Sequence, residues 1–355
     1  MANIYKNFSP DDIVTVKKKV TTGVFSGNAA TLTSFFTGSQ AAETGSTGRG
    51  LYHLNVYNAN PVSDSTAAVQ FSLSYGNYNG YGTPTLATDS GSRRPTQAVY
   101  KQYANTLLPV TCTQFTFYTG STADGHTSDD IFVVNFSRAR IKEELDTDSF
   151  EIHISGSNGI FKFIDDSADI TNPTITPGGV VYNIASGTID LTTTGSDVVT
   201  YTASNGEGYG KFYPESGLVI LNPSAIGDTV GLVGSVEITG STGNTAADTY
   251  ENLHYDLYDG LVGGSYIKAR SAQDVSSENY FVRVRNREFN FSNNPTFVTG
   301  SDKQIISSLY NEPVTYISTI GLYNENNELL AVAKTSKPIL NGRDTEALVK
   351  IKIDF

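Results

Sequence analysis

The chain has 355 residues, of which 38% are hydrophobic and only 17% are charged, and it contains 21 Tyr, 18 Phe and no Trp. Its formal net charge of −12 repels phosphate backbones and anionic lipid surfaces, so neither nucleic acid nor a membrane is an expected partner. The single cysteine, Cys112, excludes an intrachain disulfide and a cysteine-based zinc site, and its strand-like surroundings predict an ordinary buried residue.

The N-terminal residues 1–30 are predicted to form an extended arm. Residues 8–20 carry two aspartates and three consecutive lysines without a clear apolar period, so they can bury little apolar area. Residues 1–7 lack the apolar core of a signal peptide, and no apolar run reaches the roughly 18 residues that would span a membrane. We therefore expect a protein that is made in the cytosol and is kept there or in a particle assembled there.

Residues 31–171 are predicted to form a first β-sandwich-like domain. Residues 51–57 and 69–75 alternate strictly between apolar and polar side chains and should be adjacent antiparallel strands. The segment 76–94 is rich in Gly, Tyr, Ser and Thr, which predicts a long loop, and residues 96–108 carry apolar side chains at helical spacing. Further strands are predicted at 115–118, 131–136, 150–154 and 160–164.

A second β-rich domain is predicted over residues 180–355. It follows the Pro- and Gly-containing segment 172–179, which is the best candidate for a domain boundary. Short strands are predicted at regular spacing before a short helix at 249–258, and these strands are 180–184, 198–202, 209–213, 218–221 and 230–238. The predicted fold class is therefore all-β, with two closely associated β-sandwich-like domains, one or two short helices and the extended N-terminal arm.

The last quarter of the chain has the cleanest strand pattern. Residues 314–334 contain two β-branched and aromatic runs on either side of an Asn-rich turn, which predicts a β-hairpin. Pro338 is expected to end its second strand, and a final strand that reaches Phe355 is predicted after a turn at Asn341. Upstream, residues 281–285 alternate valine with arginine, as in a strand with one solvent-exposed face.

Several stretches also resemble a known class of proteins. Residues 278–298 (ENYFVRVRNREFNFSNNPTFV), the hairpin 314–338 (VTYISTIGLYNENNELLAVAKTSKP) and the ending 347–355 resemble virion structural proteins of large contractile-tailed bacteriophages, including those that infect cyanobacteria. Residues 134–140 (VNFSRAR) and 213–222 (YPESGLVILN) look similar as well. The resemblance implies a part of the phage particle in or near the tail, neck or baseplate.

Side chains with catalytic or metal-binding chemistry are scattered along the chain. Two groups of aspartates, Asp124 with Asp129 and Asp130, and Asp146 with Asp148, offer oxygen ligands for calcium but follow no EF-hand spacing, and such groups are typically solvated loop tips. None of the histidines has a partner at ligand spacing. They are His53, His126, His153 and His254. We therefore expect no cofactor, no small-molecule substrate and no enzymatic activity.

Three arginines are candidate interface residues. Arg283, Arg285 and Arg287 alternate with other residues along a predicted strand of an acidic protein, so they should share one face. Arginine pairs with carboxylates through two parallel hydrogen bonds and is enriched at interfaces. Two interpretations stay open: the arginines are solvated or pair with local carboxylates, or they contact an acidic neighbouring subunit.

Aromatic residues in two other regions are the remaining interface candidates. They are Tyr75, Tyr78 and Tyr81 around the long loop, and Phe25, Phe35 and Phe36 after the N-terminal arm. The three tyrosines can form a subunit-contact patch, a platform for a sugar, or ordinary loop packing. The three phenylalanines can pack against a neighbouring subunit or against the first sheet.

These observations favour a non-enzymatic structural component of a tailed-phage virion. Its expected partners are copies of itself and other virion proteins, contacted repeatedly around a symmetry axis. The alternative is a recognition module of the tail that binds host-surface polysaccharide. A polysaccharide hydrolase is a third class, for which the sequence offers no distinctive pair of carboxylates.

Overall fold

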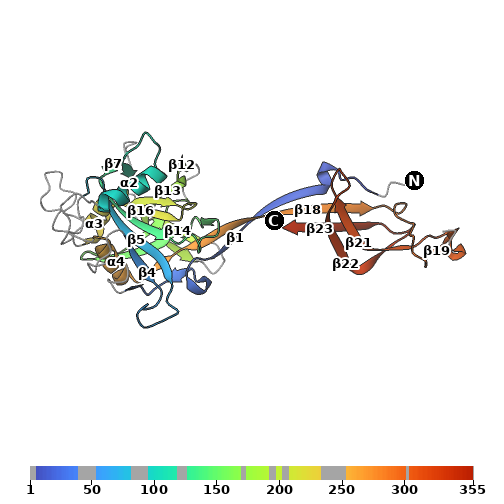
Figure 1. Ribbon diagram of the computed structural model, residues 1–355, viewed down its shortest axis with the longest axis horizontal. Coiled ribbons are helices and arrows are strands. Elements are labelled where there is room, and N and C mark those ends of the chain that lie inside the picture. The colour runs from blue at the N-terminus through green and yellow to red at the C-terminus, as the bar shows by residue number, and fades with distance from the viewer. Residues whose placement is uncertain are drawn as a thin grey trace. The chain divides into compact units, whose positions relative to one another are not determined.

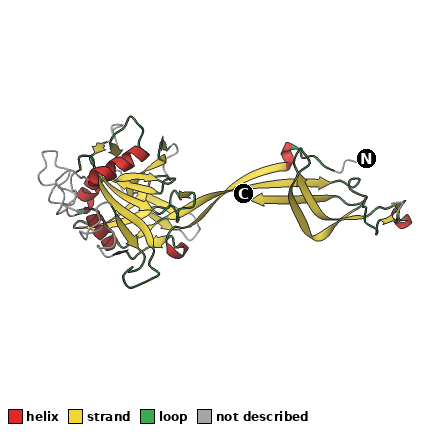
Figure 2. Ribbon diagram, in the orientation of Figure 1, coloured by secondary structure: helices red, strands yellow, loops and turns green. Residues whose placement is uncertain are grey.

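The computed structural model describes residues 5–38, 53–80, 95–117, 126–168, 173–191, 197–201, 208–232, 253–300 and 304–354. Antiparallel strands dominate this part of the chain, together with three α-helices (Figure 1, Figure 2). The predicted all-β class is therefore confirmed. The chain divides into two compact units: unit 1 comprises Met1–Lys19 and Asp274–Phe355, and unit 2 comprises Val20–Gln273.

Unit 2 is built around a curled antiparallel sheet of thirteen strands in the described residues. In spatial order its main path is β2 (Thr31–Leu32), β17 (Ile267–Lys268), β10 (Glu151–Gly156), β11 (Gly159–Asp165), β13 (Gly179–Leu191), β15 (Gly210–Tyr213), β16 (Leu218–Leu221), β8 (Asp130–Phe136), β5 (Val69–Asn77), β4 (Leu54–Tyr57) and β3 (Phe36–Thr37). Strands β12 (Thr174–Thr176) and β14 (Asp197–Tyr201) pair with β13 beside this path. Because β2 and β3 are joined by a short segment that spans at most about 14 Å, the two edges of the sheet must approach each other.

The central strands of this sheet bury both faces. In β8, Phe132 and Val134 belong to the larger hydrophobic cluster, which lies on what we call the inner face, while Ile131 and Val133 belong to a second cluster on the outer face. Strand β16 alternates between the same two clusters. Since the side chains on both faces of these strands are buried, the strands are continuous apolar runs in the sequence.

Helices and a small hairpin cover the two faces. On the inner face, α3 (Pro223–Val230) and α4 (Leu253–Gly264) pack into the larger cluster. Helix α4 lies close to β10 because Gly264 has no side chain: a Cβ there would lie 2.2 Å from the carbonyl oxygen of His153. On the outer face, α2 (Pro95–Leu107) and the hairpin of β6 (Phe115–Phe117) and β7 (His126–Ser128) cover the second cluster.

Unit 1 consists of strands and turns. Strand β18 (Arg270–Val284) lies between β1 (Ile13–Gly23) and β23 (Ala347–Asp354), and its first residues belong to unit 2, where they pair with β9 (Glu144–Leu145). A long hairpin is formed by β21 (Thr315–Tyr323) and β22 (Leu329–Asn341), and a short one by β19 (Val298–Thr299) and β20 (Gln304–Ile305). Single 3-10 turns lie at Pro10–Asp12 and Ser307–Leu309 in unit 1, and at Ser26–Asn28 in unit 2.

Several predicted elements are confirmed. The hairpin predicted at 314–334 is the β21–β22 pair, the strands predicted at 51–57 and 69–75 contain the adjacent antiparallel β4 and β5, and the helix predicted at 96–108 is α2. No helix among the described residues is long and apolar enough to cross a lipid bilayer.

The predicted domain limits differ from the observed units. Strands β11 and β13 pair with each other on either side of the segment 172–179, so the sheet continues across the predicted boundary. Residues 13–23 of the predicted arm form β1, and Val24 and Phe25 are buried in the inner cluster of unit 2. The expectation that residues 8–20 bury little is met, because none of them is buried and only Phe8 and Asp12 are partly covered.

Three local predictions are wrong. Pro338 does not end the second strand of the long hairpin, because the ladder shifts register between Ile339 and Lys334 and leaves Pro338 outside its hydrogen-bonded pairs. Val230 ends helix α3 and does not begin a strand, and most of the predicted strand 230–238 lies outside the described residues. Cys112 is exposed, not buried, because it follows α2 in a surface turn.

Helix α3 was missed although its ends carry recognisable signals. The side chain of Asn222 accepts a hydrogen bond from the backbone N–H of Ser224, Pro223 occupies the first turn, and Gly231 closes the helix in the left-handed conformation. The helix predicted at 249–258 is α4, which is described from Leu253 and extends to Gly264.

Candidate functional site

The three candidate arginines do not share one strand face. Arg283 is in β18 and forms an ion pair with Glu346, at 2.6 Å between Nη2 and Oε2, and this partner raises the pKa of the guanidinium. Arg285 and Arg287 follow the end of the strand and are exposed. For Arg283 the interpretation as a partner of a local carboxylate is therefore the one that the structure supports.

The two candidate tyrosines that the structure describes pack inside unit 2. Tyr75 is buried in the inner cluster and donates a hydrogen bond to the carboxylate of Asp130, so it cannot belong to a surface patch. Tyr78 packs edge-on against Tyr100 of α2, with 5.6 Å between the ring centroids, which corresponds to loop packing. Tyr81 lies outside the described residues.

Two of the three candidate phenylalanines are core residues. Phe25 packs on Phe136, and Phe35 packs on Phe71, so both contact the first sheet and not a neighbouring subunit. Phe36 in β3 is 37% exposed and remains a surface residue. The glycine and asparagine residues around these aromatics gave no indication of which of them face inward.

Neither aspartate group forms a metal site in the described residues, where no cluster of three or more ligating side chains occurs. Asp146 is buried, and Asp148 is linked through Ser167 to Asp165, a residue that the sequence did not single out. Asp129 accepts hydrogen bonds from Asn79 and Gln114. Asp124 and the side chain of His126 lie outside the described residues.

Two buried carboxyls in unit 2 titrate at unusual values. Burial raises the pKa of Asp130 and that of Asp165 to about 6, although hydrogen bonds to each carboxylate act in the opposite direction. Asp130 accepts from Tyr75 and Asn77, and Asp165 accepts from the backbone N–H groups of Asp148 and Phe150. Through these hydrogen bonds, each carboxyl connects a loop or a strand end to the sheet.

Two histidines have defined surroundings away from any ligand cluster. The Nε2 atom of His153 lies 2.6 Å from Oε1 of Glu151, and its ring stacks on Tyr266 with 4.4 Å between the centroids. His254 is buried in α4 beside the ring of Tyr255. Both have structural roles in unit 2.

Unit 1 exposes an unusual amount of apolar surface. Among the described residues of this unit, only a few apolar side chains are buried, namely Val284, Phe297, Val298, Leu322, Ala347 and Ile351. Its large exposed apolar side chains outnumber them, and they are Tyr5, Ile13, Val14, Val16, Phe289, Phe291, Tyr310, Tyr316, Tyr323, Leu329, Leu330, Val332, Leu340 and Leu348. Unit 2 shows the reverse balance, since nearly all buried apolar residues of the chain belong to it.

The turn end of the β21–β22 hairpin carries the densest part of this surface, which we call the hairpin surface: Tyr323, Leu329, Leu330 and Val332. Tyr323 and Leu329 lie over Gly321, where an added Cβ would be 2.8 and 3.2 Å from their side-chain atoms. Val332 is the register partner of Gly321 and therefore shares its face. This face of the hairpin thus presents contiguous apolar groups.

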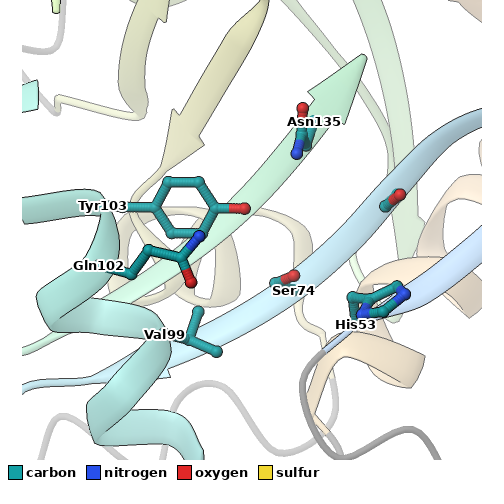
Figure 3. A pocket seen from close by; sticks show the side chains of 7 residues that line it. His53, Ser74, Val99, Gln102, Tyr103 and Asn135 are labelled. Atoms are coloured by element: carbon teal, nitrogen blue, oxygen red, sulfur yellow. The ribbon is translucent and has the colours of Figure 1, made fainter. Parts of the chain in front are cut away.

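Unit 2 contains a polar cleft of about 250 Å³ between α2 and the outer face of the sheet (Figure 3). We call it the α2 cleft, and it is lined by His53, Ser72, Ser74, Val99, Gln102, Tyr103 and Asn135. Burial raises the pKa of Tyr103, whose hydroxyl faces the side chains of Asn135 and Ser74 across the cleft. No sequence motif marks the cleft, because its residues come from four separate segments.

Comparisons with protein-family models, with curated protein sequences and with solved structures find no match to this chain.

Proposed function

We propose that this protein is a non-enzymatic structural subunit of a tailed-bacteriophage virion, in the tail, neck or baseplate region, and that it acts through contacts with copies of itself and with other virion proteins. The phage resemblance of residues 278–298 and 314–338 supports the kind of particle. Both stretches belong to unit 1. The same unit carries the apolar surface on which the proposal depends.

The main support for this proposal is the imbalance between buried and exposed apolar groups in unit 1. A unit of this size exposes far more surface per residue than a large domain does, and few buried side chains leave it marginally stable. Exposed apolar patches on such a unit are typical of protein–protein interfaces. Contact with another chain would remove the hairpin surface from water and stabilise the unit at the same time.

A copy of the same chain is the partner that is present whenever the protein folds. Full burial of a Leu or Val side chain contributes about 1.5–3 kcal/mol. Leu330 and Val332 are 68% and 54% exposed, so covering both contributes about 2–3 kcal/mol per chain. That free energy corresponds to a roughly 30- to 150-fold change in an association constant.

The test compares self-association of the full chain with that of two double variants. Replacing Leu330 and Val332 by serine should weaken the assembly seen by sedimentation velocity over a range of protein concentrations. Val62→Ser with Val110→Ser is the matched control, because these valines are 73% and 101% exposed in unit 2. The control should assemble as the unchanged chain does.

A separate measurement tests whether the protein is part of the virion. Mass spectrometry of purified particles should find the protein at a fixed copy number per particle. A chain that stays monomeric at all concentrations and is missing from purified particles would contradict the proposal.

A further inference from the structure

The α2 cleft is polar at a position where packing favours apolar side chains. On the outer face, β8 places Ile131 and Val133 in the cluster beneath α2. On the same face, the next strand carries Ser74 opposite Val133, and Ser72 opposite Asn135. The outer face of the sheet therefore changes from apolar side chains to polar side chains over these two neighbouring residue pairs.

The helix side of the cleft is polar as well. Val99, Gln102 and Tyr103 follow each other at helical i, i+3, i+4 spacing, so they lie on one face of α2. Figure 3 shows Gln102 and Tyr103 projecting from the helix toward the strands that carry Ser74 and Asn135. His53, which directly precedes β4, forms the end of the cleft.

Part of this polar lining is available to a ligand. The hydroxyl of Tyr103 faces Ser74 and Asn135 on the sheet, and Ser72 donates a hydrogen bond to Asn55. Gln102 and His53 are exposed, and neither side chain makes a hydrogen bond within the described part of the chain. Packing of unit 2 therefore does not require these two side chains.

The lining indicates the class of ligand. It includes no Lys, Arg, Asp or Glu, so a charged ligand such as a phosphate would find no permanently charged partner. Val99 is the only aliphatic member, which disfavours an apolar ligand. Amide and hydroxyl side chains both donate and accept hydrogen bonds, and sugar hydroxyls do the same.

The size of the cleft is compatible with a small ligand. Pockets for drug-sized molecules have volumes of about 300–1,000 Å³, and the α2 cleft lies just below this range. The rings of Tyr103 and His53 add flat surfaces against which the C–H groups of a sugar ring can pack. One or two sugar rings fit these requirements.

We propose that the α2 cleft binds a neutral saccharide of one or two rings, with Gln102 and His53 making hydrogen bonds to its hydroxyls and Tyr103 packing against a ring. This inference does not depend on the assembly role proposed for unit 1. It assigns unit 2 a recognition function of its own.

The experiment titrates the full chain with free glucose, galactose, mannose, N-acetylglucosamine and lactose, followed by ligand-observed NMR and calorimetry. Glucose 6-phosphate serves as the charged comparison. We expect saturable binding of at least one neutral sugar, and binding weakened about tenfold by Gln102→Ala and by His53→Ala, since each removes one hydrogen-bonding partner. Both side chains are exposed, so neither change disturbs packing.

Lys101→Ala is the control, because Lys101 is the exposed neighbour of Gln102 on α2 but does not line the cleft. It should leave sugar binding unchanged. Absence of saturable binding for all five neutral sugars would overturn the proposal. Binding that survives both cleft substitutions, or that is selective for the phosphorylated sugar, would overturn it as well.

Discussion

Replacing Asp130 by asparagine tests whether a buried carboxyl controls how the stability of unit 2 depends on pH. Asp130 is 4% exposed, and burial raises its pKa to about 6 from an ordinary value of 3.8. Tyr75 and Asn77 both donate to the same oxygen, Oδ1. An asparagine keeps that acceptor oxygen and is neutral at every pH.

The sign and size of the effect follow from the pKa difference. Because the folded-state pKa is the higher one, this group stabilises the folded protein fully below about pH 4, and the contribution is lost as the pH rises through about 6. A difference of roughly two pKa units corresponds to about 3 kcal/mol. The stability of Asp130→Asn relative to the unchanged protein should therefore rise by about 3 kcal/mol between pH 4 and pH 7.

The assay is urea unfolding at several pH values, followed by far-ultraviolet circular dichroism because the chain has no Trp for fluorescence. The amide N–H₂ of the new asparagine can add a constant cost, so the pH dependence of the difference is the quantity to compare. Asp165 and Asp256 also have pKa values raised to about 6, and they cancel because both proteins contain them. Asp228→Asn removes the same formal charge from an exposed position of unit 2 away from Asp130 and should leave the pH dependence as it is.

A difference in unfolding free energy that stays constant between pH 4 and pH 7 would refute this reasoning. It would mean that the hydrogen bonds from Tyr75 and Asn77 offset the cost of burying the charge. The carboxylate would then be ionised in the folded protein at an ordinary pKa.

Three further predictions concern packing, accessibility and assembly. Gly76→Ala should lower the unfolding free energy by about 1–3 kcal/mol, since the new Cβ would lie 2.8 Å from the backbone nitrogen of Tyr100. Gly342→Ala is the control and should not lower it, because the nearest atom to its new Cβ is 3.7 Å away. Equal melting temperatures of the two variants would contradict this prediction. Cys112 should react with a thiol reagent at one equivalent per chain without denaturant, and a reaction that requires denaturant would show that the thiol is covered. Replacing Arg283, Arg285 and Arg287 together by serine should leave the isolated chain folded, as judged by circular dichroism, but impair its incorporation into particles. Normal incorporation of this variant would exclude an interface role for the three arginines.

Local patterns predicted much of the secondary structure. The hairpin of β21 and β22 was recognised from two β-branched runs around an Asn-rich turn, and α2 from its helical spacing. The sheet order was beyond such reasoning, because the pairing of β16 with β8 joins residues that are about eighty positions apart. For the same reason the predicted boundary at 172–179 separated strands that share one sheet.

The candidate sites show the same limit. For Tyr75, which borders a polar loop, a contact patch, a sugar platform and loop packing all stayed open, yet its alternation with Phe71 and Leu73 in β5 places it on the inner face. The α2 cleft combines a residue before β4, two from β5, three from α2 and one from β8. Its members become neighbours only through the register of those strands, which single-sequence patterns do not supply.

The surface of unit 1 explains why its strands gave the clearest signal and still left its role open. Alternation between apolar and polar side chains predicts that one face of a strand is buried, but it does not say against what. In unit 2 the buried faces meet helices of the same unit. In unit 1, Val332, Leu330 and Tyr316 follow the pattern of a half-buried strand and are nevertheless more than half exposed. When alternation predicts a buried strand face but that face is exposed in the single chain, the protein is expected to be a subunit whose exposed face is covered by another molecule.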